Sequence, residues 1–86
     1  MSYKRSKLEI YLEVLKVINK DTEKPTRIMY RTNLSWKPLT KVLESMQDQG
    51  FITSHKKGGS TIYKVTEKGK NVLKYFTEAM ELIEIK

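Results

Sequence analysis

The chain has 86 residues, 38% of them hydrophobic and 31% charged, and its 17 Lys and Arg outnumber 10 Asp and Glu to give a net charge of +7. This size and composition indicate one small globular domain with a marginal core, so that association with a second copy would add useful buried area. The lack of cysteine excludes disulfides and thiolate sites, a single histidine (His55) is too few for a histidine-based metal site, and no apolar run approaches the roughly 20 residues that span a bilayer.

The positive charge is distributed unevenly along the chain. Residues 1–43 have a net charge of +6, whereas residues 44–86 have a net charge of +1. A basic protein can simply be soluble, but this asymmetry favours a polyanionic partner. Because no apolar signal segment follows the basic N-terminus, we expect a cytoplasmic protein.

Residues 6–19 are predicted to form the first helix, because apolar side chains recur there at steps of three and four. Val14 and Val17 lie off this stripe and suggest that a second face is also covered. A polar segment ended by Pro25 separates this helix from the next. The stripe consists of Leu8, Tyr11, Leu12, Leu15 and Ile18.

A short second helix is expected at 27–32, capped by Thr26, with Ile28 and Met29 facing the core. Asn33 and the leucine after it form a tight turn before a third helix begins. A helix, a tight turn and a second helix make a helix-turn-helix pattern.

The third helix is the best-specified element of the sequence. Ser35 is its N-cap, and Pro38 falls in the first turn, so we expect Ser35 to accept a hydrogen bond from the Lys37 N–H instead of from the third position. Leu34 and Leu39 occupy the two positions of a hydrophobic staple. The inward stripe consists of Leu39, Val42, Leu43 and Met46.

Gly50 ends the third helix in the manner of a C′ glycine, and two β-prone runs follow at 51–55 and 61–65. The intervening Lys-Lys-Gly-Gly-Ser, residues 56–60, is expected to be the hairpin loop. Its paired glycines supply the positive φ angles that such a loop needs.

Thr66 is predicted to cap a last helix that runs to about Ile85. The resulting order predicts an α+β, mostly α fold, a winged helix-turn-helix of three helices and a two-stranded wing, with an additional C-terminal helix. Within one structural domain, residues 1–66 would form the DNA-binding part and 67–86 the dimerisation helix. The apolar residues of that helix are Val72, Phe76, Ala79, Met80 and Ile83 on one face, and Leu73, Leu82 and Ile85 on another.

The outward side of the third helix carries the candidate reading residues. An α-helix fits the major groove of B-DNA, and exposed residues near its N-terminus meet the base edges. Lys37 and Lys41 share one face, but lysine pairs are also common on solvated helices. For Trp36 we favour covering the core beside the staple over contact with DNA. The predicted DNA-binding set is Arg27, Arg31, Ser35, Trp36, Lys37, Thr40, Lys41, Lys56 and Lys57.

Two further basic clusters support this assignment. Arg27 and Arg31 lie four residues apart on the second helix, which typically crosses the DNA backbone. Lys56 and Lys57 stand beside flexible glycines and could reach a neighbouring minor groove or its phosphates. Glu44 would mark the edge of the contact zone. A basic N-terminal group could add a contact, although a frayed tail is the simpler explanation for Lys4, Arg5 and Lys7.

The last helix is too acidic at its end to bind DNA and too apolar to stay bare in water. It could fold back on the first helix and complete the monomer core. We favour pairing with the same helix of a second chain, which would place two reading helices roughly 34–36 Å apart on successive major grooves. The predicted dimerisation residues are Val72, Leu73, Phe76, Met80 and Ile83.

Four pieces of sequence, spread over nearly the whole chain, are distinctive: RSKLEI at 5–10, TRIMY at 26–30, NLS at 33–35 and YKVTEKG at 63–69. Together they resemble the small basic winged-helix DNA-binding proteins of Sulfolobus-type archaea. The resemblance implies a dimer that binds double-stranded DNA in a chromatin-associated or transcriptional role, with the last helices paired antiparallel. About nineteen residues remain for that helix, near 28 Å in length, which suggests a more compact dimer.

The leading hypothesis is therefore a homodimeric, double-stranded DNA-binding transcriptional regulator. Its basis is positive charge gathered on one side of the fold, opposite an apolar helix. The alternatives are a sequence-nonspecific archaeal chromatin protein and a winged-helix protein-interaction module with an acidic partner. RNA binding is disfavoured because no exposed aromatic platform is evident. We expect no enzyme, metal, cofactor or small-molecule effector, since nothing in the sequence provides acid–base or nucleophilic chemistry.

Overall fold

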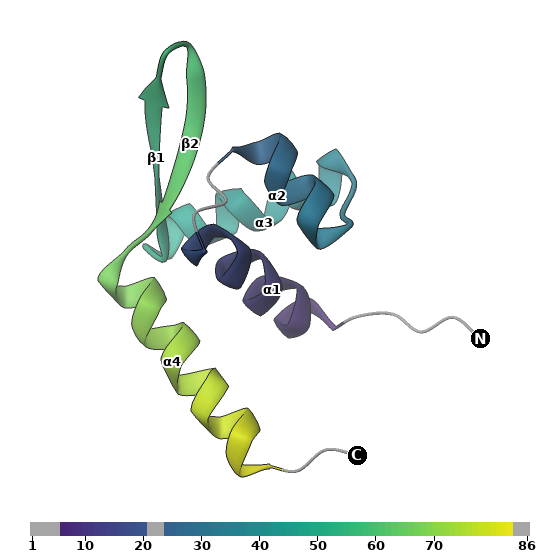
Figure 1. The fold of residues 1–86 in the computed structure, drawn as a ribbon, viewed down its shortest axis with the longest axis vertical. Helices are drawn as coiled ribbons and strands as arrows, with labels where there is room; N and C mark the ends of the chain where they lie inside the picture. The colour runs from purple at the N-terminus through teal and green to yellow at the C-terminus, as the bar shows by residue number, and fades with distance from the viewer. Residues whose placement is uncertain (1–5, 21–23, 84–86) are drawn as a thin grey trace, which may run out of the picture.

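The computed structural model describes residues 6–20 and 24–83 (Figure 1). The elements within these residues are α1 (Lys7–Asn19), α2 (Pro25–Thr32), α3 (Trp36–Asp48), β1 (Ile52–Lys57), β2 (Ser60–Val65) and α4 (Glu67–Leu82). This is the predicted winged helix-turn-helix with one additional C-terminal helix. Three residues named above, Lys4, Arg5 and Ile85, lie outside the described part of the chain.

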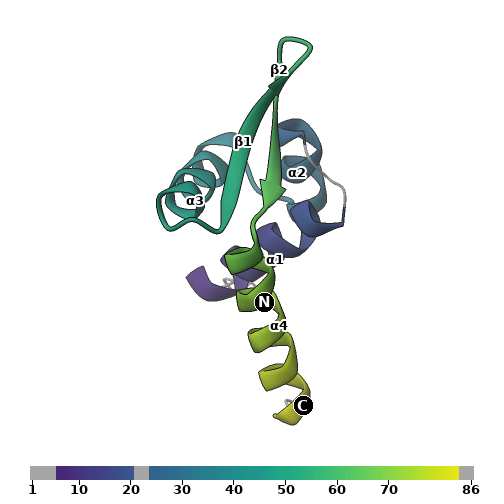
Figure 2. The ribbon, with the colours of Figure 1, turned by 90° about the vertical axis from the view of Figure 1, so that its left-hand side faces the viewer.

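The three N-terminal helices form a bundle from which two elements project at opposite ends (Figures 1 and 2). The β1–β2 hairpin extends from one end, and α4 leaves from the other. α1 contacts α2, β2 and α4, while α3 contacts β1. Because the hairpin and α4 project in opposite directions, the molecule is elongated, with extents of 44 × 33 × 21 Å. The hairpin and α3 therefore lie together, and the far end of α4 lies away from both.

The core forms where the helices and the base of the hairpin converge. Val14 has no exposed surface, whereas Leu8, on the predicted stripe of α1, is 51% exposed. Leu12, Leu15 and Ile18 of the stripe are buried together with Val14, so α1 is covered on a second face, as the off-stripe valines suggested. The core residues are Val14, Leu15, Ile18, Ile28, Leu39, Leu43, Met46, Ile52 and Leu73.

α2 begins earlier than the sequence pattern predicts. Its N-cap is Lys24, and Pro25 takes the first helical position, where its fixed φ is favourable. The predicted capping role of Thr26 is therefore wrong, since this residue lies inside the helix. At the other end Asn33 adopts a left-handed conformation with φ 58°, which produces the predicted tight turn.

α3 begins and ends where the sequence indicated, but one cap differs. Ser35 has the extended backbone of an N-cap, yet its side chain makes no capping hydrogen bond, so the predicted bond from the Lys37 N–H is wrong. A proline occupies the third position, where the usual N–H partner of a capping serine would be. At the C-terminal end Gly50 has φ 79°, and the Phe51 N–H donates to the Met46 carbonyl at 2.9 Å, which confirms the C′ glycine.

The hairpin has longer strands and a shorter turn than predicted. Lys56 pairs with Thr61 and Lys57 with Ser60, so both lysines belong to the ribbon and not to a five-residue loop. The two glycines at 58–59 make the turn alone, with φ of 55° and 81°. Positive φ at both positions gives the two-residue turn whose twist matches that of the strands. The wing is therefore a regular ribbon up to its tip.

α4 is capped by Thr66, as predicted, because the Thr66 side chain accepts a hydrogen bond from the Gly69 N–H at 3.1 Å. Leu73 is buried in the core, and Val72 is half-buried against it. Beyond these residues the apolar side chains are open to solvent, and Leu82 is 86% exposed. The helix is thus anchored to its own chain by its first half only.

Candidate nucleic-acid interface

The outward side of α3 brings several predicted reading residues together. Lys37 and Lys41 are exposed, and Trp36 at the start of the helix is 54% exposed, so the favoured role of Trp36 in covering the core is wrong. The Thr40 hydroxyl donates to the Trp36 carbonyl at 2.8 Å. Its hydrogen is therefore engaged within the helix, and its oxygen is left to accept. This surface offers two cations, an indole and a hydroxyl on consecutive turns of one helix.

Lys7 extends the same basic surface from a neighbouring helix. The start of α1 is fixed by a capping box in which the Glu9 N–H donates to the Ser6 side chain at 3.1 Å and the Ser6 N–H donates to the Glu9 carboxylate at 3.5 Å. Lys7 is thus the first residue of a capped helix and not part of a frayed tail. The Ser-x-x-Glu spacing carried this signal. A hollow of about 290 Å³ is lined by Lys7, Ile10, Tyr11, Lys41 and Val42.

The two lysines of the wing point to opposite faces of the ribbon. Successive residues of a strand alternate between faces, so Lys56 shares a face with Ser54 and Lys57 does not. The Ser54 hydroxyl accepts a hydrogen bond from the Gln47 side chain of α3 at 2.8 Å. Lys56 therefore lies on the side of the ribbon that faces α3, and Lys57 on the other side.

Tyr63 lies on the α3-facing side of the ribbon as well, since it pairs with Ser54. Burial raises the pKa of the Tyr63 phenol, and the negative charge of Glu44 on α3 raises this pKa further. Glu44 is exposed, and its effect on Tyr63 of the hairpin places it on the hairpin side of α3. This position is consistent with the prediction that Glu44 marks the edge of the reading surface.

Tyr63 should make the stability of the fold sensitive to alkaline pH. The unfolded phenol loses its proton near pH 10, whereas the folded phenol keeps it to higher pH, so the stabilisation present below about pH 10 is lost as the pH rises through the folded pKa. Urea unfolding of Tyr63→Phe should therefore show a smaller fall in unfolding free energy between about pH 9 and 11 than the wild type. Groups common to both proteins cancel in this comparison, and parallel curves would contradict the assignment.

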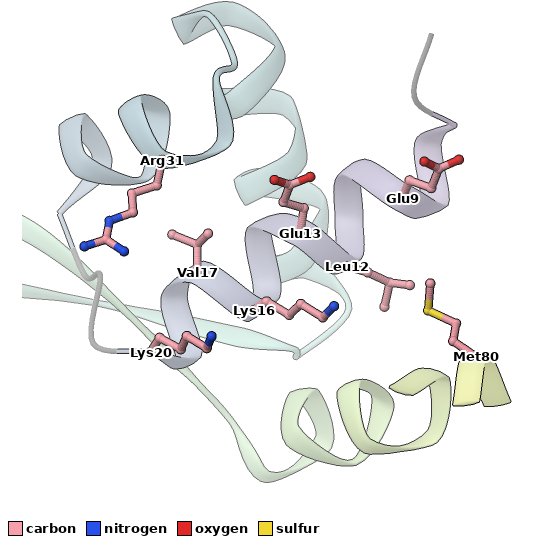
Figure 3. Close-up of a pocket in the computed structure, with 8 residues that line it drawn as sticks. All are labelled: Glu9, Leu12, Glu13, Lys16, Val17, Lys20, Arg31 and Met80. Carbon is pink, nitrogen blue, oxygen red and sulfur yellow. The ribbon is translucent and has the colours of Figure 1, made fainter. Parts of the chain in front are cut away.

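The two arginines of α2 share one surface but not one direction. Arg27 and Arg31 both line a hollow of about 390 Å³, together with Thr26 and Tyr30. Arg31 also extends alongside α1, where it lines a larger hollow of about 550 Å³ between α1, α2 and α4 (Figure 3). Both side chains are exposed, but only Arg31 also faces α1.

One exposed aromatic residue on α2 was not predicted from the sequence. Tyr30 is 88% exposed, and with Trp36 it places two accessible aromatic rings on the helix-turn-helix. The sequence therefore underestimated the exposed aromatic surface of the helix-turn-helix. Tyr30 falls opposite buried Ile28 on a short helix, and the sequence carried too few turns to assign its outward face.

A second basic group lies on α1 and α4. It lines a groove of about 480 Å³ that also contains Glu78 and Glu81, and no residue of α3 or of the hairpin lines it. Positive charge is therefore not confined to one side of the fold, which corrects the expectation from the sequence. The basic members of this group are Lys16, Lys20, Lys70 and Lys74.

The exposed apolar surface of α4 is an outward stripe distinct from its core-facing side. Leu73, predicted as a dimerisation residue, is 7% exposed and packs in the core of its own chain. Tyr75, which was not predicted, is 79% exposed. Steps of three and four along the helix define the outward stripe as Tyr75, Phe76, Ala79, Leu82 and Ile83, with half-buried Val72 at its base.

Among the described residues, no three or more His, Cys, Asp or Glu side chains gather in a way that could hold a metal ion. Over the same residues, none of the helices combines the length and apolarity needed to cross a membrane.

Comparison with known proteins identifies relatives over nearly the whole chain. Residues 4–84 match the family model for the winged helix-turn-helix. An uncharacterised protein of Methanocaldococcus jannaschii, MJ0287, is 36% identical over 83 residues, which cover 96% of this chain and 78% of that protein.

Two solved structures show the same fold. Sso10a-2, a DNA-binding protein from Sulfolobus solfataricus, has a TM-score of 0.78 at 24% identity over 91% of this chain and 81% of that one. A MarR family protein from Bacillus stearothermophilus has a TM-score of 0.77 at 12% identity over 92% of this chain and 56% of that one. At these identities the likeness concerns the fold alone. With the family match over 4–84, it follows that the chain belongs to the winged helix-turn-helix family.

Proposed function

We propose that this protein binds double-stranded DNA as a homodimer and acts as a transcriptional regulator at the nucleoid. α3 would enter the major groove, and the hairpin would contact the flanking groove or its phosphates. The observation that carries this proposal is the basic surface formed by Lys7, Lys37 and Lys41, with Lys56 on the α3 side of the adjacent ribbon.

The chemistry of this surface suits a DNA duplex. Lysine side chains neutralise phosphates and release counterions, which supplies affinity, while the first turns of a helix in the major groove supply base contacts. Trp36 and Thr40 add a flat apolar surface and a hydrogen-bond acceptor beside the two lysines. Sso10a-2, which shares this fold, is described as a DNA-binding protein, and this supports the proposal.

The dimer would form through the outward stripe of α4. Four large apolar side chains of this stripe, those of Tyr75, Phe76, Leu82 and Ile83, are exposed, and such a patch marks an interaction surface more often than a bare surface of a monomer. The first half of α4 carries Lys68, Lys70 and Lys74, whereas the second half carries Glu78 and Glu81. Four of these charged residues, Lys70, Lys74, Glu78 and Glu81, line the groove with α1 and not the outward stripe, so the surface proposed to pair is itself apolar.

A sequence-nonspecific chromatin protein is the second candidate. The basic group on α1 and α4 favours it, because Lys16, Lys20, Lys70 and Lys74 add charge that the reading surface does not need. A polyanion held by several faces needs no base contacts. The two candidates share the DNA-binding surface and differ in the discrimination between sites.

A binding titration tests the proposal and separates the candidates. Affinity for a random duplex is measured over a range of salt concentrations and compared with affinity for genomic fragments enriched by the protein. Both candidates require affinity to fall steeply with salt. A regulator should prefer the enriched fragments by a factor of about 10³ or more, and a chromatin protein should show almost no preference. Binding that does not respond to salt would reject DNA binding through this surface.

A further inference from the structure

The C-terminal end of α3 is tied directly to the first turn of α4. The Thr66 hydroxyl donates to the Gly50 carbonyl at 2.6 Å, and the Thr66 N–H donates to the Phe51 carbonyl at 3.0 Å. The Lys68 ammonium donates to the Gln49 carbonyl at 2.8 Å. Three consecutive carbonyl groups at the end of the proposed reading helix therefore take their partners from the start of α4.

These contacts are chemically well matched. Carbonyls at a helix C-terminus lack intrahelical partners and carry the negative end of the helix dipole, so a lysine ammonium is favourable there. Thr66 acts in both directions, because its oxygen also accepts the Gly69 N–H at 3.1 Å and so caps α4. One hydroxyl thus begins α4 and holds it to the end of α3.

Gly69 allows this close approach. A Cβ atom at position 69 would lie 2.2 Å from the Phe51 carbonyl oxygen and 2.7 Å from a methyl group of Val65. The Lys68 ammonium lies 5.2 Å from the centre of the Phe51 ring, on the same side of the junction. The first turn of α4 therefore sits against the backbone after α3 with no room for a side chain between them.

The end of α3 is also held by α1. The Tyr11 hydroxyl donates to the Ser45 hydroxyl, and the Gln49 side chain donates to the Tyr11 oxygen at 3.3 Å. α3 is thus fixed relative to α1 on one side and linked to α4 on the other. The direction of α4 is then set by the junction made by Thr66, Lys68 and Gly69, together with the packing of Leu73 in the core.

We infer that Thr66, Lys68 and Gly69 are positioning residues that set the angle between the proposed reading helix and α4. In the dimer, which rests on the proposed function, this angle determines the separation of the two reading helices and hence the spacing of DNA half-sites. α4 has 16 residues and is about 24 Å long, so a change of about 10° at its start moves its far end by about 4 Å. A shift of that size at the dimer face is comparable to one base-pair step.

The absence of cysteine allows a direct test with spin labels. Labels at Lys41→Cys on α3 and Glu78→Cys on α4 report the distance between the two helices within one chain, with labelled chains diluted in unlabelled protein. Lys68→Met keeps the apolar stem over Phe51 and removes the ammonium, and Thr66→Val removes the hydroxyl. Position 78 lies about 17 Å from the start of α4, so a change of about 10° in the double variant should broaden or shift the distance distribution by about 3 Å.

Matched variants distinguish positioning from general stability. Thr66→Ser and Lys68→Arg retain the hydrogen-bond donors and should restore the wild-type distribution. Gly69→Ala should shift the distance, since the Phe51 carbonyl must move by about 1 Å to admit the new methyl group. An unchanged distribution in a folded Lys68→Met, Thr66→Val double variant would overturn the inference.

A second label pair separates this inference from the proposed dimer. A single label at Lys37→Cys in each chain reports the distance between two reading helices, and this distance should lose definition in the double variant. If no interchain distance appears in the wild type, the proposed dimer fails, while the intrachain measurement still tests the junction. If the interchain distance is present and the double variant leaves both distributions unchanged, the junction does not position α4.

Discussion

Replacing Lys37 and Lys41 together by alanine is expected to abolish most duplex binding at moderate salt while leaving the fold intact. Both side chains are exposed, so their removal creates no cavity. Removing one lysine–phosphate contact lowers the slope of log affinity against log salt by about 0.9, so the slope should fall by about two per bound chain. At about 0.1 M salt this corresponds to a reduction in affinity of about 50-fold or more.

A charge-matched control decides whether the effect is local. Lys70→Ala with Lys74→Ala removes the same charge from the groove between α1 and α4, where no residue of α3 contributes. Fluorescence anisotropy titrations of one labelled duplex compare the three proteins at several salt concentrations. Equal reductions in the two double variants would mean that overall charge holds the DNA, and would contradict α3 as the reading helix.

Much of the fold could be predicted because its boundaries have local causes. A capping serine and glutamate start α1, Thr66 starts α4, and a glycine with φ 79° ends α3. Each of these signals acts within about four residues and needs no knowledge of the rest of the chain. The paired glycines of the hairpin turn are another local signal, since the turn itself requires positive φ at both positions.

The errors arose where local rules competed or where tertiary packing decided the outcome. At α2 a threonine cap competed with Pro25 at the first helical position, and the proline determined the start. At α1 the periodic stripe placed Leu8 inward, but this residue lies in the first turn of the helix and is 51% exposed. Periodicity defines a face of a helix and does not say how far along the helix that face is covered.

Individual residues of the candidate site could be predicted from the sequence, but the surface that they form together could not. Lys37 and Lys41 share a face because helical spacing alone puts them there. That Lys7 joins them, that Arg31 extends along α1, and that four other lysines gather between α1 and α4 all depend on how helices pack. Sequence spacing contains no information on those distances, so the distribution of charge over the molecule was the weakest part of the prediction.

Replacing Phe76 and Ile83 by glutamate is expected to convert the dimer into folded monomers. Both residues lie on the outward stripe of α4, with exposed fractions of 37% and 60% in the single chain. A dimer would bury them, and burying an unpaired carboxylate costs several kcal/mol. With two new carboxylates per chain, the dimer should weaken by about 10³-fold or more, as measured by sedimentation equilibrium.

Two further measurements show whether this weakening comes from the stripe itself. Thr77→Glu with Asn19→Glu adds the same charge beside the lysines of the α1–α4 groove and should leave the dimer intact. Because Leu73 anchors α4 in the core of its own chain, the Phe76→Glu, Ile83→Glu monomer should keep its far-UV circular dichroism. That monomer presents one reading helix where the dimer presents two, so it should bind a two-site duplex no better than a one-site duplex. A dimer that survives both glutamates would remove α4 from the interface, and the apolar residues beyond Leu73 would then need another partner.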